Sequence, residues 1–171
     1  RSQANSVDMV ISGMTATEER KQIVNFSDVY CTSSVGCVTK ADSDINSFED
    51  LQNQIVCCSQ GTNYEMMIED IPGTTLKTYQ GQAAVGTAVA EATDGVAAGL
   101  TSINGAKKLA TTMLDADGNP MLKYFALEGA RADEYCMAFP KGSELTAIFN
   151  EGIQALKDSG KLEELIQYWL Y

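Results

Sequence analysis

The sequence contains no histidine among its 171 residues. This absence excludes Ser-His-Asp triads, histidine general bases and most zinc or iron centres, because these depend on imidazole. The five cysteines show no Cys-x-x-Cys spacing, which disfavours a thiolate metal site. One loop has calcium-like spacing, Asp115-x-Asp117-Gly118-Asn119, but it lacks the later ligands and final glutamate of an EF-hand, so we interpret it as a turn. We therefore expect no metal, no cofactor and no catalytic residue.

Positive charge is also scarce. The chain has 12 lysines and arginines against 23 acidic residues, a net charge of −11. Nucleic acid and anionic lipid need a basic surface, so neither is expected as a direct partner. No apolar stretch approaches the length of a transmembrane helix. With 44% hydrophobic residues, the chain can fold as one domain or two small ones.

One segment near the start combines the features of an anion site. The apolar run Val7–Ile11 predicts a buried strand that ends at Ser12–Gly13, where glycine lets the backbone turn. Thr15 and Thr17 offer hydroxyls, and Thr17 can cap a helical turn that carries Arg20. A strand end, hydroxyls and a guanidinium together favour a carboxylate socket. The alternative is a strand, a loop and an ordinary surface arginine.

The rest of the chain alternates strand and helix patterns. Residues 29–39 predict an extended crossover, and Ser47 with Asp50 predicts a capping box. Alternation predicts an α/β fold with mostly parallel pairing. We expect strands at 7–12, 55–59, 75–79, 95–100, 123–127 and 135–139, and helices at 64–71, 82–92, 102–112, 143–158 and 161–170. Thr101 or Ser102 would cap the helix that runs to about Thr112.

The motif Gly13-Met-Thr-x-Thr-x-x-Arg20, followed by Phe26-Ser-x-x-Tyr30, resembles the extracellular solute-binding proteins of bacterial ABC importers for polar amino acids. Further segments resemble this family in the same order along the chain: Ser47–Leu51, Ile55–Thr62, Tyr135–Gly142 and Ser159–Trp169. The resemblance implies a two-lobed, periplasmic-binding-protein-like α/β fold. It also implies an extracytoplasmic location, compatible with a lipid anchor in a full-length form, and delivery of a small carboxylate or amino acid to a membrane permease.

The resemblance also implies a domain layout with hinge crossovers. Residues 1–30 would form part of lobe 1 with the carboxylate loop, and residues 40–132 would form lobe 2. The crossovers would be 31–39 and 133–141, and the helices of 142–171 would pack on lobe 1. Hinge closure over a small ligand is the expected motion.

In the first lobe the resemblance implies four ligand-binding residues. Arg20 would hold the ligand carboxylate as a bidentate pair, and Gly13 would offer a backbone contact. Thr15 would contribute side chain and backbone, and Ser12 stands where family members often face the ligand.

In the second lobe, Thr62 and Asn63 open a helix, and their N–H groups would meet the same carboxylate. The alternative role of this pair is simple helix capping. One departure concerns the α-ammonium, which an Asp near the end of strand 95–100 holds in the family. Gly99 stands there in this sequence, while Asp94 matches the acidic residue that begins the strand. Recognition of an ammonium group is therefore left open.

The cysteines allow two interpretations. Cys31 or Cys37 could form a disulfide with Cys136, because the two crossovers would run side by side. Alternatively, all five are small buried hydrophobes. Cys57 and Cys58 are adjacent on a strand and should point to opposite faces, so they cannot pair with each other.

The resemblance begins in the middle of the family pattern, so we expect the N-terminal part of the first lobe to be missing. The apolar face of the last helix, with Leu162, Leu165, Ile166 and Trp169, would then favour self-association. Two other functions are compatible with the same fold. One is a dehydratase of cyclic carboxylates, for which Glu65 would be the candidate general acid. The other is the input domain of a sensor receptor.

Overall fold

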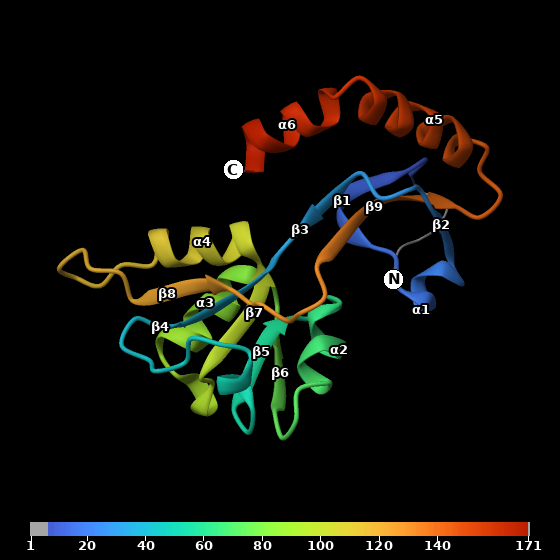
Figure 1. The fold of residues 1–171 in the computed structure, drawn as a ribbon. Coiled ribbons are helices and arrows are strands. Elements are labelled where there is room, and N and C mark those ends of the chain that lie inside the picture. Colours follow the sequence, from blue (N-terminus) through green and yellow to red (C-terminus); the bar gives the residue numbers. More distant parts are fainter. Residues whose placement is uncertain (1–6, 171) are drawn as a thin grey trace. The chain divides into compact units, whose positions relative to one another are not determined.

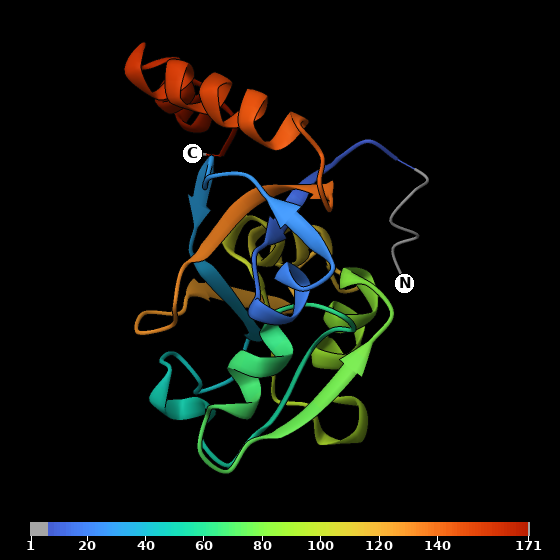
Figure 2. The same cartoon turned by 90° about the vertical axis from the view of Figure 1, so that its right-hand side faces the viewer.

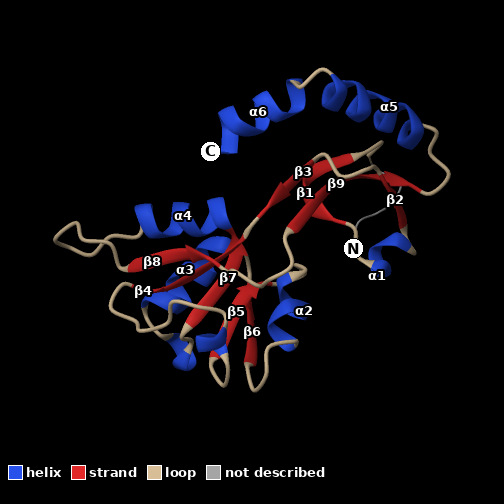
Figure 3. Cartoon of the chain, viewed as in Figure 1, coloured by secondary structure: helices blue, strands red, loops and turns tan. Residues whose placement is uncertain are grey.

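The computed structural model describes the backbone of residues 7–170 and their side chains up to Trp169. The chain divides into two compact units, which we describe separately. Unit 1 contains the residues up to Ser33 and those from Asp133 onward, and unit 2 contains Ser34–Ala132. Figure 1 labels the elements of both units, and Figure 3 shows that helices and strands are mixed, which confirms the predicted α/β class.

Unit 2 contains a five-stranded sheet in the order β6-β5-β7-β4-β8. Its strands are β4 (Val35–Lys40), β5 (Ile55–Ser59), β6 (Thr75–Tyr79), β7 (Ala98–Ser102) and β8 (Leu122–Ala126). Strand β5 is parallel to β6 and β7, whereas β4 is antiparallel to β7 and β8. The prediction of mostly parallel pairing is therefore wrong. The physical reason is that β4 follows β3 without an intervening helix and pairs antiparallel with both β7 and β8, and that all three pairings of β9 are antiparallel as well.

Helices cover both faces of this sheet. One face packs on α2 (Tyr64–Glu69) and the short η1 (Glu49–Leu51), and the other on α3 (Gln82–Ala90) and α4 (Ile103–Thr112). Cys58 belongs to the first core cluster and Cys57 to the second, which confirms that they point to opposite faces. The turn η2 (Thr93–Gly95) precedes β7.

Unit 1 is organised around β9 (Asp133–Pro140), which pairs antiparallel with three other strands. These partners are β1 (Val10–Thr15), β2 (Val24–Phe26) and β3 (Cys31–Ser33). The unit also contains the short helix α1 (Glu18–Lys21) and the helices α5 (Leu145–Asp158) and α6 (Lys161–Leu170) (Figure 2).

Within unit 1, helix α5 makes an apolar contact with β9 and a polar contact with the segment before β3. The rings of Phe139 and Phe149 lie 5.4 Å apart, and Ile153 is buried. The Asp28 amide donates to Oδ1 of Asn150 at 2.8 Å. Much of the remaining surface of α5 and α6 is exposed, and Trp169 of α6 is 74% exposed. The predicted self-association stays a prediction.

Several local predictions are confirmed. The predicted strands 55–59 and 75–79 are β5 and β6 without change, and Ser102 caps α4 by accepting from the Gly105 amide. Ser47 and Asp50 form the reciprocal capping box, each side chain accepting the other's amide hydrogen. The segment after Leu114 is a turn, because Oδ1 of Asp115 accepts from two backbone amides of the same loop.

The predicted bounds and burial of β1 are wrong, and β2 was missed. The first strand spans Val10–Thr15 instead of 7–12, and it is not buried, since Ile11 is 54% exposed. Strand β2 was not predicted at all, because three residues are too few to show a period.

The five cysteines are buried free thiols, so neither suggested disulfide is formed. Cys31 lies opposite Tyr135 in the β3–β9 ladder, and Cys136 lies opposite Met14 in the β1–β9 ladder. Cys37 belongs to unit 2, where its partners are Leu100 and Phe125. Burial raises the pKa of Cys57 to about 12 and that of Cys58 to about 11.

Within residues 7–170, no helix is both long and apolar enough to cross a membrane. The same described part of the chain contains no group of three or more side chains suited to hold a metal ion.

Candidate functional site

A bulge in β1 forms the centre of the candidate site in unit 1. Val10 pairs with Ala138 and Met14 with Cys136, so four steps along β1 match only two along β9. Gly13 lies inside this irregular stretch with φ +57°, a left-handed conformation that glycine adopts without strain. The prediction that the strand ends at Ser12–Gly13 is wrong, because the chain bulges there and then rejoins the sheet. Ser12 and Gly13 are left exposed.

Arg20 is fixed beside this bulge. Its guanidinium Nη1 donates to the carbonyl oxygen of Thr15 at 3.0 Å and to Oγ1 of Thr15 at 3.4 Å. Its backbone amide donates to Oγ1 of Thr17 at 3.2 Å, which confirms Thr17 as the N-cap of α1. Two threonines that precede α1 therefore hold Arg20: Thr15 accepts from its side chain and Thr17 from its backbone amide.

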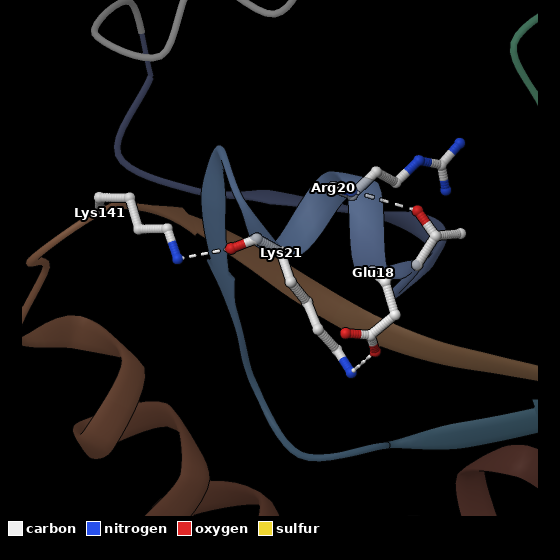
Figure 4. A network of polar contacts seen from close by, with 5 residues as sticks. Glu18, Arg20, Lys21 and Lys141 are labelled. Carbon is white, nitrogen blue, oxygen red and sulfur yellow. Dashed lines mark hydrogen bonds and ion pairs between the residues drawn. The ribbon is translucent and has the colours of Figure 1, made fainter.

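Glu18 and Lys21 of α1 pair with each other, and the backbone of Lys21 accepts a hydrogen bond from Lys141 (Figure 4). Lys21 Nζ lies 2.7 Å from Oε1 of Glu18, and this partner lowers the pKa of the Glu18 carboxyl. Lys141 donates to the Lys21 carbonyl oxygen at 2.6 Å. In Figure 4 the Arg20 side chain points away from the Glu18–Lys21 pair, so the Glu18 carboxylate is engaged by Lys21 and not by Arg20.

The structure therefore brings together the four predicted residues of the first lobe: Ser12, Gly13, Thr15 and Arg20. Arg20 and Thr15 are half-buried, whereas the bulge is open to solvent. A fixed guanidinium beside hydroxyl and backbone donors is suited to a carboxylate, because the planar fork can donate two parallel hydrogen bonds.

The two predicted residues of unit 2 lie before α2. Thr62 Oγ1 donates to the Ser59 carbonyl oxygen at 2.7 Å, which closes the loop after β5. Asn63 occupies the N-cap position, but its side chain makes no capping hydrogen bond, so side-chain capping does not account for it. The carboxylate of Glu65 accepts from the Gly61 amide, which ties it to the same loop.

The structure does not place Gly99 at the strand end where the family's ammonium-binding Asp was expected. Gly99 is the second residue of β7, opposite Val38 and Cys57, and it is buried. A Cβ atom there would lie 2.8 Å from Cγ1 of Val85, so the position faces the core under α3. The alignment of the strand end with Gly99 is therefore wrong, because β7 continues to Ser102. Asp94 precedes the strand and lies 3.6 Å from Lys77 Nζ.

The carboxyl end of β7 instead carries a polar group that sequence reasoning missed. A Cβ atom at Gly105 would lie 2.5 Å from Nε2 of Gln82 and 2.7 Å from Oγ1 of Thr101. The buried Nε2 of Gln82 has no hydrogen-bond partner among the described residues. In this region the sequence pattern indicates only the helix cap at Ser102. A glutamine at the start of a helix, such as Gln82, is common and does not by itself indicate a binding site.

Comparisons with known proteins identify relatives of the chain. The arginine-binding extracellular protein ArtP of Bacillus subtilis is 34% identical over 97% of this chain and 64% of its own length. The glutamine-binding protein GlnH of the same organism is 30% identical over 98% of this chain and 59% of its own length. The chain thus spans about three fifths of these curated relatives.

Solved structures match in fold as well. The arginine-, lysine-, histidine-binding protein ArtJ of Geobacillus stearothermophilus superposes with a TM-score of 0.80 at 27% identity, over 98% of this chain and 71% of that one. An ancestral arginine-binding protein superposes with a TM-score of 0.81 at 27% identity, over 99% and 74% of the two chains. These matches confirm the predicted periplasmic-binding-protein-like fold. The model of the bacterial extracellular solute-binding proteins, family 3, matches residues 1–171, and the chain belongs to that family.

Proposed function

We propose that this chain binds the carboxylate of a small solute, an amino acid or a close relative, outside the cytoplasm for delivery to an ABC importer. The observation that carries this proposal is the Arg20 guanidinium, anchored on Thr15 beside the exposed bulge of β1. An arginine held in this way keeps its fork geometry before the ligand arrives, which lowers the entropic cost of binding. Ser12, Gly13 and Thr15 would complete this socket in unit 1, and Thr62 and Asn63 stay predicted ligand-binding residues.

The relatives favour an amino acid as the solute, since ArtP and GlnH are named for arginine and glutamine. Delivery to a membrane permease is the corresponding partner function. The neutral side chains of Gln82 and Thr101 at the end of β7 could form hydrogen bonds with a polar group of the ligand. Such contacts would not require an acidic residue at position 99.

Binding without catalysis is the function that the site supports best. A structural neighbour is described as an ancestral amino acid-binding protein that is a precursor of cyclohexadienyl dehydratase, with 26% identity and a TM-score of 0.77. A dehydratase would need a carboxyl group available as general acid, whereas the Glu65 carboxylate accepts from the Gly61 amide. Incubation with cyclic carboxylates that carry a ring hydroxyl should therefore yield no dehydrated product.

The carboxylate requirement can be tested with matched ligands. We expect isothermal titration calorimetry to show binding of L-arginine or L-glutamine. Agmatine, which is arginine without its carboxylate, should bind at least tenfold more weakly. Agmatine that binds as tightly as L-arginine would contradict carboxylate recognition. L-Glutamine and L-cystine in parallel titrations would identify the preferred side chain.

A further inference from the structure

The carboxyl ends of three strands meet at one edge of the unit 2 sheet. Strand β5 is parallel to both of its neighbours, β6 and β7, so all three strands end at the same edge. Open α/β sheets bind their ligands beyond this edge. The segments 59–65, 79–82 and 101–105 contain the ends of these strands and the residues that follow them, so they lie where unit 2 would meet a ligand.

These three segments carry almost no charge. They contain one acidic residue, Glu65, and no lysine or arginine. The Glu65 carboxylate accepts from the Gly61 amide, so it is already engaged within its own loop. Between the ends of β5 and β6, the side-chain amide of Gln80 donates to the side-chain carbonyl oxygen of Gln60. The edge is therefore neutral and polar, although the whole chain has a net charge of −11.

One side-chain amide at this edge lacks an acceptor. Gln82 begins α3 and is half-buried as a residue, whereas its Nε2 atom is buried and has no hydrogen-bond partner in the described part of the chain. This Nε2 and Oγ1 of Thr101 lie 2.5 Å and 2.7 Å from one point beside the backbone of Gly105, so the amide and the hydroxyl are close neighbours. Buried donors in folded proteins are nearly always paired, so the Gln82 amide requires an acceptor.

The chemistry of the edge indicates which solute group would supply that acceptor. A guanidinium or ammonium group offers only donors and cannot satisfy Nε2 of Gln82. A carboxylate would accept from Nε2, but the three segments hold no lysine or arginine to compensate its charge. A neutral amide meets both demands, because its carbonyl oxygen accepts from Gln82 and its N–H groups donate to the Thr101 hydroxyl.

We infer that Gln82 is a specificity-determining residue that selects a solute with a neutral amide side chain, L-glutamine, over L-arginine and L-glutamate. The inference rests on the proposed function, because it requires that an amino acid is bound, and it names the side chain that unit 2 recognises. The three amino acids share the same α-carboxylate for Arg20. The difference between their affinities therefore comes from the side chain.

The test compares the three amino acids by isothermal titration calorimetry in the wild type and in Gln82→Met, which removes the amide from a side chain of similar length. We expect the wild type to bind L-glutamine at least tenfold more tightly than L-arginine or L-glutamate. Gln82→Met should bind L-glutamine about tenfold more weakly, with little change for L-arginine. Gln52→Met is the matched control and should bind as wild type, because Gln52 is exposed and precedes β5 at the opposite end of the strands.

Urea unfolding separates recognition of the solute from packing of the chain. Because Nε2 of Gln82 has no partner among the described residues, Gln82→Met should unfold at a urea midpoint equal to or above that of the wild type. A clearly lower midpoint would show that the amide has a structural partner and would overturn the inference.

Two results of the titrations would overturn it as well. One is a wild type that binds L-arginine or L-glutamate as tightly as L-glutamine, and the other is wild-type affinity for L-glutamine in Gln82→Met. In either case the proposed function stands as long as Arg20→Lys weakens binding, so the two failures are distinguishable. If the wild type binds none of the three amino acids, the proposed function fails for them, and the inference about Gln82 fails with it.

Discussion

Replacement of Gly99 by aspartate distinguishes two placements of this residue. If Gly99 stood at the strand end in the site, Gly99→Asp would restore a partner for an α-ammonium. The structure places it in the core, where a Cβ atom would lie 2.8 Å from Cγ1 of Val85 and 3.1 Å from Cγ2 of both Val38 and Val89. Overpacking of this kind costs about 1–3 kcal/mol.

The carboxyl group adds a larger cost. It would enter the cluster formed by Val38, Cys57, Val85 and Val89, where the charged form is disfavoured and the pKa rises. Keeping the group protonated at pH 7, about three units above its ordinary pKa, costs about 4 kcal/mol. The total of about 5–7 kcal/mol is comparable to the whole stability of a small domain, about 5–15 kcal/mol.

Urea unfolding of wild type, Gly99→Ala and Gly99→Asp measures these terms separately. The alanine variant reports the steric cost alone, and the aspartate variant should be largely unfolded at pH 7. Because the folded pKa is raised, the extra deficit of aspartate grows as pH rises above about 3.9 and should shrink at pH 4. An aspartate variant as stable as wild type at pH 7, with tighter binding of amino acids, would refute the core placement of Gly99.

Further predictions concern caps, close contacts and thiols. Thr17→Ala removes the acceptor for the Arg20 amide and should cost about 1 kcal/mol of unfolding free energy, with weaker solute binding; unchanged stability and affinity would contradict the cap. Gly36→Ala should lower the free energy of unfolding by about 2 kcal/mol or more, because its Cβ would lie 2.8 Å from the α-carbon of Ile103 in α4. Gly152→Ala, at an open position in α5, should raise the free energy of unfolding by up to about 1 kcal/mol. The cysteines should resist a thiol reagent at pH 8 until the protein unfolds, since a pKa of about 12 leaves Cys57 roughly one part in ten thousand as thiolate. Rapid labelling of the native protein would contradict this burial.

The sequence predicts the elements that local chemistry determines. Strands β5 and β6 are short runs that contain β-branched residues and are bounded by turn residues, and both were predicted to the residue. The caps at Thr17 and Ser102 follow from a hydroxyl before a helical segment, and both are present. The contact between Arg20 and Thr15 is predictable for the same reason, because the two residues lie within one turn and its flanking strand.

Features that depend on pairing between distant segments could not be predicted in this way. The direction of β4 against β7 is a property of the sheet, and no pattern within residues 35–40 reveals it. The β1 bulge arises from a mismatch with β9, more than a hundred residues later in the sequence. Gly99 was misplaced because an alignment of letters does not show where a strand ends, and two more residues of β7 follow the expected end at Leu100.

The central claim is that the Arg20 guanidinium binds the solute carboxylate as a planar fork, and calorimetry of Arg20→Lys tests it most directly. Lysine keeps the charge but cannot form the bidentate contact, so loss of a charge-assisted pair of about 1.5–3 kcal/mol should weaken L-arginine or L-glutamine binding roughly ten- to a hundredfold. Arg131→Lys, which makes the same exchange at an exposed position of unit 2, is the matched control and should bind as wild type. Wild-type affinity in Arg20→Lys would contradict the carboxylate fork.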